Sequence, residues 1–251
     1  MISKSSSGRS RPGFTLIELL VVIAILIVLV GLTTSAVMRF RVTGPRLATK
    51  TNLQNIKKQL DSQWSAVLGK ADKESIPTAM QAGLVIATGA SGVSDPRVHS
   101  AYNQLKLVQA FPVSFGEVMN PPATFLTPWP AYVRHLASLG VTPANANTIA
   151  TLDIQQSICL LMILEKGPNN SGITQESLGS TNTKLLTVGT KTAYGCVDAF
   201  GTPLLFSRGA GPVLAPLIVS AGVDMQYGVD ITNPAFPVTS PNFATDNLTA
   251  P

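Results

Sequence analysis

The residue with the clearest chemical consequence is Glu18, because its carboxylate stands at the start of an otherwise apolar segment. Residues 19–38 contain no charged side chain and consist mostly of Leu, Val and Ile. A helix of this length rises about 30 Å, which matches the hydrocarbon core of a bilayer. A charge in such a helix costs about 2.5 to 3.5 kcal/mol at mid-membrane and usually has a partner. Glu18 therefore requires a positively charged partner.

Two general interpretations of this amino-terminal region leave Glu18 unexplained. Residues 1–13 carry three basic side chains, no acid and several serines, as a secretory signal peptide does. The apolar run is longer than the roughly 7 to 15 residues of a signal core, and no clear A-x-A cleavage site follows it. The second interpretation is a plain membrane anchor with its basic end in the cytoplasm, although two arginines beyond the run weaken that charge bias.

Residues 13–18, Gly-Phe-Thr-Leu-Ile-Glu, resemble the processing signal of type IV pilins and type II secretion pseudopilins. The resemblance implies that a prepilin peptidase cuts between Gly13 and Phe14 and then methylates the new amino terminus on Phe14. Glu18 would lie about one helical turn from that amino group. In this family the carboxylate pairs with the amino terminus of a neighbouring subunit during assembly, so the resemblance implies an assembly role for Glu18.

The resemblance also divides the chain into four segments. Residues 1–13 would be the leader peptide and residues 14–38 the transmembrane helix. Residues 39–68 would continue this helix as an amphipathic segment, and residues 69–251 would form a periplasmic or extracellular globular domain. The expected fold class is α+β, with a long amino-terminal helix packed on a small antiparallel sheet and on additional helices.

The amphipathic segment carries one apolar stripe at helical spacing. Its members are Leu47, Leu53, Ile56, Leu60, Trp64 and Val67. The stripe predicts packing against the globular domain and assigns no chemistry to these residues. Gly44 and Pro45 are expected to interrupt the helix ahead of it, because proline lacks a backbone donor and its ring clashes with the preceding turn.

Further elements follow from local pattern. Residues 69–95, rich in Gly, Ala and Ser, are expected to form a loop, with a short helix within it as the alternative. Helices are expected over residues 96–111, 131–139 and 151–166, the last of which is apolar on nearly all sides and should be buried. In the last third of the chain, short apolar runs bounded by Gly and Pro predict strands joined by turns.

Two motifs in the last third carry a second resemblance. Residues 198–203, Asp-Ala-Phe-Gly-Thr-Pro, and residues 220–224, Ser-Ala-Gly-Val-Asp, resemble the carboxy-terminal strands of the major pseudopilin. In that family the following loop binds calcium, which implies a ligand at Asp224, with Asp230 and Asp246 as further candidates. Calcium takes about six to eight oxygen ligands. The alternative is that these aspartates hydrogen-bond to the backbone of their own turns.

The two cysteines, Cys159 and Cys196, show no spacing typical of a zinc site. A single disulfide between them is compatible with an exported domain. The alternative for Cys159, which lies in the apolar run Ile-Cys-Leu-Leu-Met-Ile-Leu, is a buried free thiol.

Charge and motifs exclude two broad classes of function. Of the net charge of +5, +3 lies in residues 1–13, and no basic stripe interleaved with aromatic residues follows, so nucleic-acid binding is not expected. The only histidines, His99 and His135, lack a metal-ligand neighbour at i+4, and the motifs of serine hydrolases and nucleotide-binding enzymes are missing from the sequence. The sequence gives no reason to expect an enzyme.

The sequence thus predicts a prepilin-like structural subunit. It would be inserted once in the bacterial inner membrane with its carboxy-terminal domain in the periplasm or outside the cell. The expected partners are prepilin peptidase and other pilin or pseudopilin subunits, in a type II secretion pseudopilus or a type IV pilus-like filament. The alternative is a membrane-anchored periplasmic binding or sensing domain that does not polymerise. Apart from calcium, no cofactor is expected.

Overall fold

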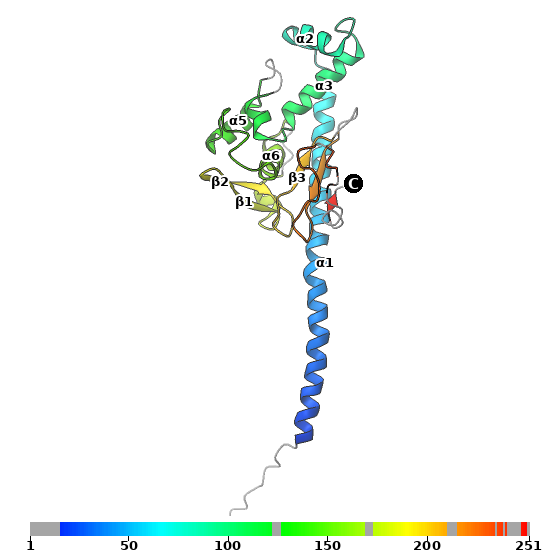
Figure 1. The fold of residues 1–251 in the computed structure, drawn as a ribbon. Coiled ribbons are helices and arrows are strands. Elements are labelled where there is room, and N and C mark those ends of the chain that lie inside the picture. Colours follow the sequence, from blue (N-terminus) through cyan, green and yellow to red (C-terminus); the bar gives the residue numbers. More distant parts are fainter. Residues whose placement is uncertain are drawn as a thin grey trace, which may run out of the picture. The chain divides into compact units, whose positions relative to one another are not determined.

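A computed structural model describes residues 16–121, 127–168, 173–209, 215–233, 235–237, 239 and 247–249. Its internal contacts separate the chain into two compact units, Met1–Gly44 and Pro45–Pro251. Helix α1 (Leu16–Ala71) contributes residues to both units (Figure 1).

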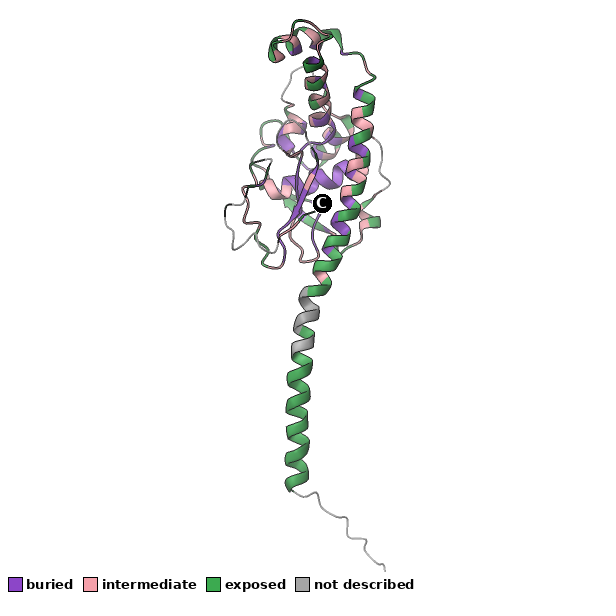
Figure 2. Ribbon diagram, turned by 90° about the vertical axis from the view of Figure 1, so that its right-hand side faces the viewer, coloured by how far each residue is buried: buried purple, intermediate pink, exposed green. Residues whose placement is uncertain are grey.

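The first unit is described from residue 16 onward, and there it is helix. Its large apolar side chains from Leu16 to Leu32 are exposed, as the green colour of Figure 2 shows. The two threonines that follow Leu32 turn their hydroxyl groups back onto the helix: Thr33 donates to the Leu29 carbonyl at 2.9 Å, and Thr34 donates to the Val30 carbonyl at 2.7 Å. These bonds satisfy the hydroxyl groups within the segment, which is a requirement in an apolar environment.

The prediction that Gly44 and Pro45 interrupt the helix is wrong, since α1 continues through Pro45 to Ala71. A proline inside a helix removes one backbone hydrogen bond and costs about 3 kcal/mol. The helix continues because the following turns bury large side chains, each of which contributes about 1.5 to 3 kcal/mol. The step from Gly44 to Pro45 is nevertheless the boundary between the two compact units.

Within the second unit, α1 buries most of the predicted stripe. Leu53, Ile56, Leu60 and Trp64 belong to the main hydrophobic core, and Val67 packs against it. The prediction is wrong for Leu47, whose side chain is 66% exposed, and Thr49, at 1%, takes the buried position instead. Leu47 and Leu53 are six positions apart, and six positions rotate an α-helix by about 600°, about 120° short of two full turns, so Leu47 lies well off the stripe.

Six further helices follow α1 in the part of the chain that the structure describes. They are α2 (Thr78–Thr88), α3 (Pro96–Ala110), α4 (Phe115–Met119), α5 (Pro130–Ser138), α6 (Leu152–Lys166) and α7 (Gln175–Leu178). The three helices predicted after residue 95 are thus confirmed, as α3, α5 and α6. Helix α2 lies within residues 69–95, where a loop with or without a short helix was expected. It forms because Met80 and Leu84 pack with Val98 and Tyr102 of α3 in a separate small core.

The described strands form two small antiparallel sheets. The first pairs β1 (Thr183–Val188) with β2 (Lys191–Cys196). The second has the order β3-β4-β5, formed by β3 (Leu205–Ser207), β4 (Leu217–Ser220) and β5 (Leu248–Thr249). The α+β fold class predicted from the sequence is confirmed.

Helix α6 lies at the centre of the main core and contacts both sheets, through β2 and β3 (Figure 1). Its residues from Gln155 to Leu164 are all buried. The helix comes so close to β2 that a Cβ atom on Gly195 would lie 2.5 Å from the Ser157 hydroxyl oxygen and 2.6 Å from a methyl carbon of Leu186. Ser157 also donates a hydrogen bond to the Cys196 carbonyl at 2.7 Å. The glycine therefore permits this packing of helix on strand.

Candidate functional site

The predicted cleavage residues, Gly13 and Phe14, lie outside the described residues. Glu18 lies in the first turn of α1 and is exposed. An acidic side chain at this end of a helix interacts favourably with the helix dipole. Its exposure leaves the Glu18 carboxylate within reach of a second molecule.

The surface around Glu18 is apolar. Large side chains from Leu16 to Leu32 are each about half exposed or more, and the segment Leu16–Thr34 is the one described helix that is long and apolar enough to cross a membrane. Soluble proteins rarely leave so large a continuous apolar surface in water. Lipid or neighbouring apolar helices are the surroundings that suit it.

The two motifs of the last third meet at Asp198. This residue is 1% exposed, and its Oδ1 accepts hydrogen bonds from the amides of Phe200 at 3.0 Å and Thr202 at 2.9 Å. Its second oxygen accepts a bond from the Ser220 hydroxyl at 2.7 Å. The Ser220 oxygen in turn accepts the amide of Gly222 at 3.1 Å. One carboxylate therefore joins the turn of the first motif to the strand end that begins the second.

The same turn is attached to α1. The amide of Ala199 donates to the buried Thr49 hydroxyl at 3.1 Å, over a sequence separation of 150 residues. Burial raises the pKa of Asp198, and the hydrogen bonds from Ser220, Thr202 and Phe200 oppose that rise. We define Asp198, Ser220 and Thr49 as the Asp198 junction. The role of this junction is structural, because its polar side chains form hydrogen bonds to other segments of the same chain.

The candidate calcium ligands make turn hydrogen bonds of their own. Asp224 accepts the amide of Gln226 at 2.9 Å, and Asp230 accepts both the amide and the hydroxyl of Thr232, at 2.9 and 2.6 Å. The bonds from Thr232 lower the pKa of Asp230. Asp246 lies outside the described residues. Within the described part of the chain no three acidic, histidine or cysteine residues cluster as metal ligands would. Calcium binding stays a prediction.

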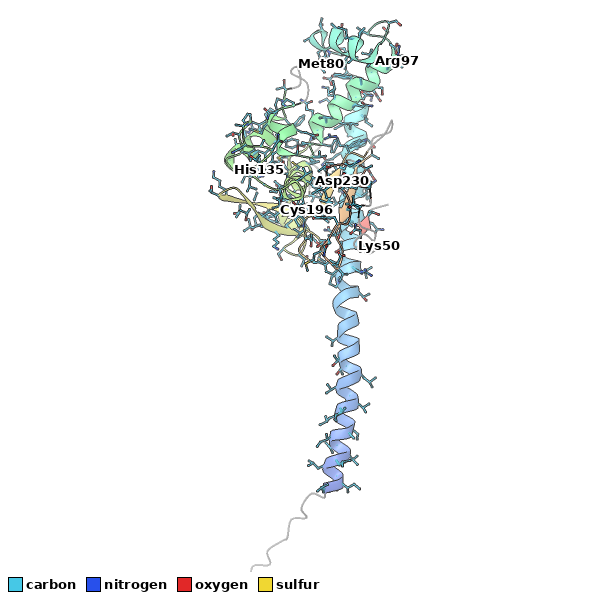
Figure 3. All side chains as sticks on the ribbon, viewed as in Figure 1. Lys50, Met80, Arg97, His135, Cys196 and Asp230 are labelled. Carbon is cyan, nitrogen blue, oxygen red and sulfur yellow. The ribbon has the colours of Figure 1, made fainter. Side chains whose placement is uncertain are left out.

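Both cysteines are free thiols buried in the core, and Figure 3 labels the position of Cys196. Burial raises the pKa of both thiols. Their charged neighbours differ: Glu117 and Arg208 act on Cys159, and Glu165 acts on Cys196. A buried thiol whose pKa is raised is a poor nucleophile at neutral pH, because the thiolate is the reactive form.

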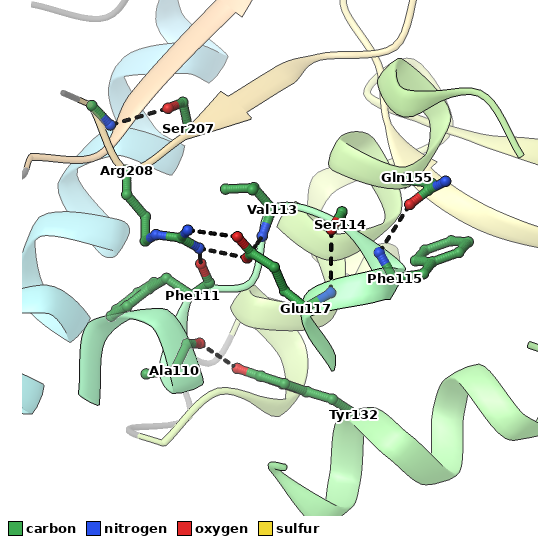
Figure 4. Close-up of polar contacts among 11 residues, drawn as sticks. Ala110, Phe111, Val113, Ser114, Phe115, Glu117, Tyr132, Gln155, Ser207 and Arg208 are labelled. Carbon is green, nitrogen blue, oxygen red and sulfur yellow. Dashed lines mark hydrogen bonds and ion pairs between the residues drawn. The ribbon is translucent and has the colours of Figure 1, made fainter. Parts of the chain in front are cut away.

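An ion pair that the sequence analysis did not identify connects β3 to α4. Arg208 donates to both carboxylate oxygens of Glu117, at 2.6 and 2.7 Å, and to the Phe111 carbonyl at 2.8 Å (Figure 4). Glu117 also accepts the Val113 amide at 2.9 Å. Only 15% of the Arg208 side chain and 24% of the Glu117 side chain are exposed. The partners lie 91 residues apart, and neither belongs to a recognisable motif, so no local signal could have paired them.

One segment of the chain matches a known protein family. Residues 8–34 match the family described as the prokaryotic N-terminal methylation motif. The match includes Gly13, Phe14, Glu18 and the apolar part of α1. The chain therefore carries a prepilin-type signal followed by an apolar helix, consistent with the signal of type IV pilins and pseudopilins. No match was found among curated proteins or among solved structures.

Proposed function

We propose that this chain is the precursor of a filament subunit. Prepilin peptidase cuts it between Gly13 and Phe14 and methylates the new amino terminus. The processed subunit then assembles with other pilin or pseudopilin subunits into a type II secretion pseudopilus or a type IV pilus-like filament. The observation that carries the proposal is the methylation motif over residues 8–34, which continues into a helix with an exposed carboxylate at Glu18.

The physical argument concerns the charge of Glu18. In an apolar environment an ion pair is favourable only when its partner is close and well oriented, because both charges lose their hydration. Cleavage creates an ammonium group at Phe14 within about one helical turn of Glu18. When subunits stack side by side, the carboxylate of one and the amino terminus of the next neutralise each other. Assembly in this register is thereby favoured over other registers.

The location follows from the same segment. The helix enters the inner membrane once, with residues 1–13 on the cytoplasmic side where the peptidase acts. The unit Pro45–Pro251 lies on the periplasmic side, or outside the cell once the filament extends. Its role in the filament is structural.

The test is processing followed by assembly. Intact mass spectrometry of the membrane-extracted chain is expected to show a protein that starts at methylated Phe14, and cells without prepilin peptidase should contain the uncut chain. Electron microscopy of sheared cell-surface or periplasmic material should show filaments that contain the processed chain. An uncut chain in cells with active peptidase contradicts the proposal. Processed chains that never leave the monomeric state favour the anchored binding or sensing domain instead.

A further inference from the structure

The uncharged run of α1 ends at Met38, and the chain then continues with Arg39, Phe40 and Arg41. These residues belong to α1 and to the first compact unit. We call them the Arg39–Arg41 segment. Two positions rotate an α-helix by about 200°, so Arg39 and Arg41 occupy nearly opposite sides of the helix. The segment therefore distributes positive charge around the helix and not along one face.

The depth of this segment in a membrane follows from the rise of the helix. Residues 19–38 carry no charge and span about 30 Å as a helix, which equals the hydrocarbon core of a bilayer. The headgroups add about 5 to 8 Å on each side of that core. Arg41 follows Met38 by about 4.5 Å of helix. When the uncharged run fills the hydrocarbon core, both arginines therefore lie at the depth of the headgroups, on the side opposite residues 1–13.

The sequence of α1 supplies no acid near these two arginines. The nearest acidic residues along the chain are Glu18 and Asp61, each about twenty positions away. Side chains of one helix interact directly at spacings of three or four positions, so neither carboxylate neutralises the segment from within α1. Charge complementarity therefore points to an anionic partner outside this helix.

A phospholipid phosphate and a carboxylate of a second protein molecule both carry the required charge. The positions of the arginines favour lipid, because lipids surround a membrane helix on all sides, whereas one protein surface covers one side. The guanidinium group also suits a phosphate, since it stays charged at every physiological pH and donates two parallel hydrogen bonds to the phosphate oxygens.

We propose that the Arg39–Arg41 segment binds anionic phospholipids in the leaflet opposite residues 1–13, with one lipid phosphate at each arginine. Basic residues directly after a membrane span attract anionic lipids, whose headgroups carry no positive charge to compete for the phosphate. A zwitterionic lipid does carry that competing charge, so the segment prefers phosphatidylglycerol to phosphatidylcholine. The inference rests on the membrane insertion that is part of the proposed function. It needs neither cleavage nor assembly.

The test inserts the full chain into phosphatidylcholine vesicles and measures its lipid preference by electron paramagnetic resonance, with spin-labelled phosphatidylglycerol and phosphatidylcholine as the probes. The unsubstituted chain should prefer phosphatidylglycerol. This preference should fall at about 1 M salt, where charges are screened beyond about 3 Å. The double variant Arg39→Gln, Arg41→Gln should lose at least half of the preference. The remainder is the contribution of the basic residues before the span, Lys4, Arg9 and Arg11.

The double variant Lys58→Gln, Lys70→Gln is the matched control. It removes the same charge from two exposed positions of α1 that belong to the second unit, and it should keep the full preference. Arg39→Lys, Arg41→Lys keeps the charge and should keep most of the preference.

A chain that does not insert, or that binds both lipids equally, overturns the proposal. An unchanged preference in Arg39→Gln, Arg41→Gln also overturns it, and a loss of assembly in that variant would then identify a second protein molecule as the partner. A chain with the expected lipid preference that is never cleaved or assembled in cells contradicts the proposed function and leaves this inference supported.

Discussion

At the scale of single residues, Glu18 and Asp198 are two carboxylates in opposite situations. Glu18 is exposed on an apolar helix, and its proposed partner belongs to another molecule. Asp198 is buried, and its partners belong to the same chain. Substitution of the first should therefore affect assembly, and substitution of the second should affect the stability of the fold.

Glu18→Ala should leave membrane insertion and cleavage between Gly13 and Phe14 largely intact while it blocks assembly. Removal of the carboxylate makes the helix more apolar, so insertion becomes easier. The Phe14 ammonium of the next subunit then loses its partner, at a cost of about 3 to 5 kcal/mol. Fractionation and mass spectrometry should find processed monomers in the inner membrane.

Glu18→Gln should fail to assemble in the same way, because the amide keeps the shape of the side chain and loses its charge. Filaments of normal yield from Glu18→Ala would exclude the carboxylate as the assembly contact.

Asp198→Ala should lower the free energy of unfolding by about 3 kcal/mol, because it leaves buried donors without acceptors, and each such group costs about 1 to 3 kcal/mol. The donors are the Ser220 hydroxyl and the amides of Phe200 and Thr202. Asp198→Asn keeps one carbonyl oxygen for the two amides and should cost less. Chemical denaturation measures both changes. Equal stability of Asp198→Ala and the unsubstituted chain would show that the Asp198 junction contributes nothing.

Asp198 also determines how one contribution to the stability of the fold changes with pH. Burial raises the pKa of Asp198 above its ordinary value of 3.8. Between the ordinary and the raised value the folded state binds more protons than the unfolded state, so this group's contribution to stability decreases as pH rises through that window. Asp198→Asn lacks the titrating group, so its stability relative to the unsubstituted chain should improve as pH rises above 3.8. Unfolding free energies of both chains across that range test the prediction, and a difference of constant size would contradict it.

At the scale of elements, the close contact between α6 and β2 depends on a missing side chain. Gly195→Ala should destabilise the fold by about 1 to 3 kcal/mol, the usual cost of overpacking a core. The added carbon would lie 2.5 Å from the Ser157 hydroxyl oxygen and 2.6 Å from a Leu186 methyl carbon. Both side chains are buried, so either one would have to shift within a packed core. Gly69→Ala is the control, because Gly69 lies in α1 with nothing within 4 Å of an added Cβ.

Gly69→Ala should leave stability unchanged or raise it by up to about 1 kcal/mol, since alanine favours helix more than glycine does. Thermal or chemical denaturation of both variants gives the comparison. A Gly195→Ala variant as stable as Gly69→Ala would mean that the helix and the strand can separate at little cost.

At the scale of the whole molecule, calcium binding by the carboxy-terminal loop can be tested through the thermal stability of the full chain. If Asp224 and Asp230 hold the ion, a chelator should lower the melting temperature of the full chain. A ligand that binds only the folded state stabilises it by about 2.7 kcal/mol at a hundredfold excess over its Kd. Melting of the double variant Asp224→Asn, Asp230→Asn should then be insensitive to calcium. An unchanged melting curve for the original chain, with and without chelator, would leave these aspartates as turn residues only.

Local pattern alone determined a large part of this protein. The GFTLIE signal, the apolar run after Glu18, most of the stripe on α1 and the buried helix α6 are all visible in consecutive residues. These features follow from side-chain chemistry and helical periodicity, which do not depend on distant parts of the chain. Periodicity therefore predicted the apolar helix, the stripe and the buried helix, whereas the class of signal and the α+β fold were predicted from the resemblance of the motifs to the pilin family.

The tertiary structure decided the features in which distant residues meet. Helix α1 continues through Pro45 because packing outweighs one lost hydrogen bond, and α2 forms because α3 supplies its apolar partner. The bond between Asp198 and Ser220 joins two motifs that the sequence displays separately. The pair of Arg208 and Glu117 spans 91 residues without any local signal. In each case the deciding free energy comes from a contact that exists only after the chain has folded, so no run of neighbouring residues could encode it by itself.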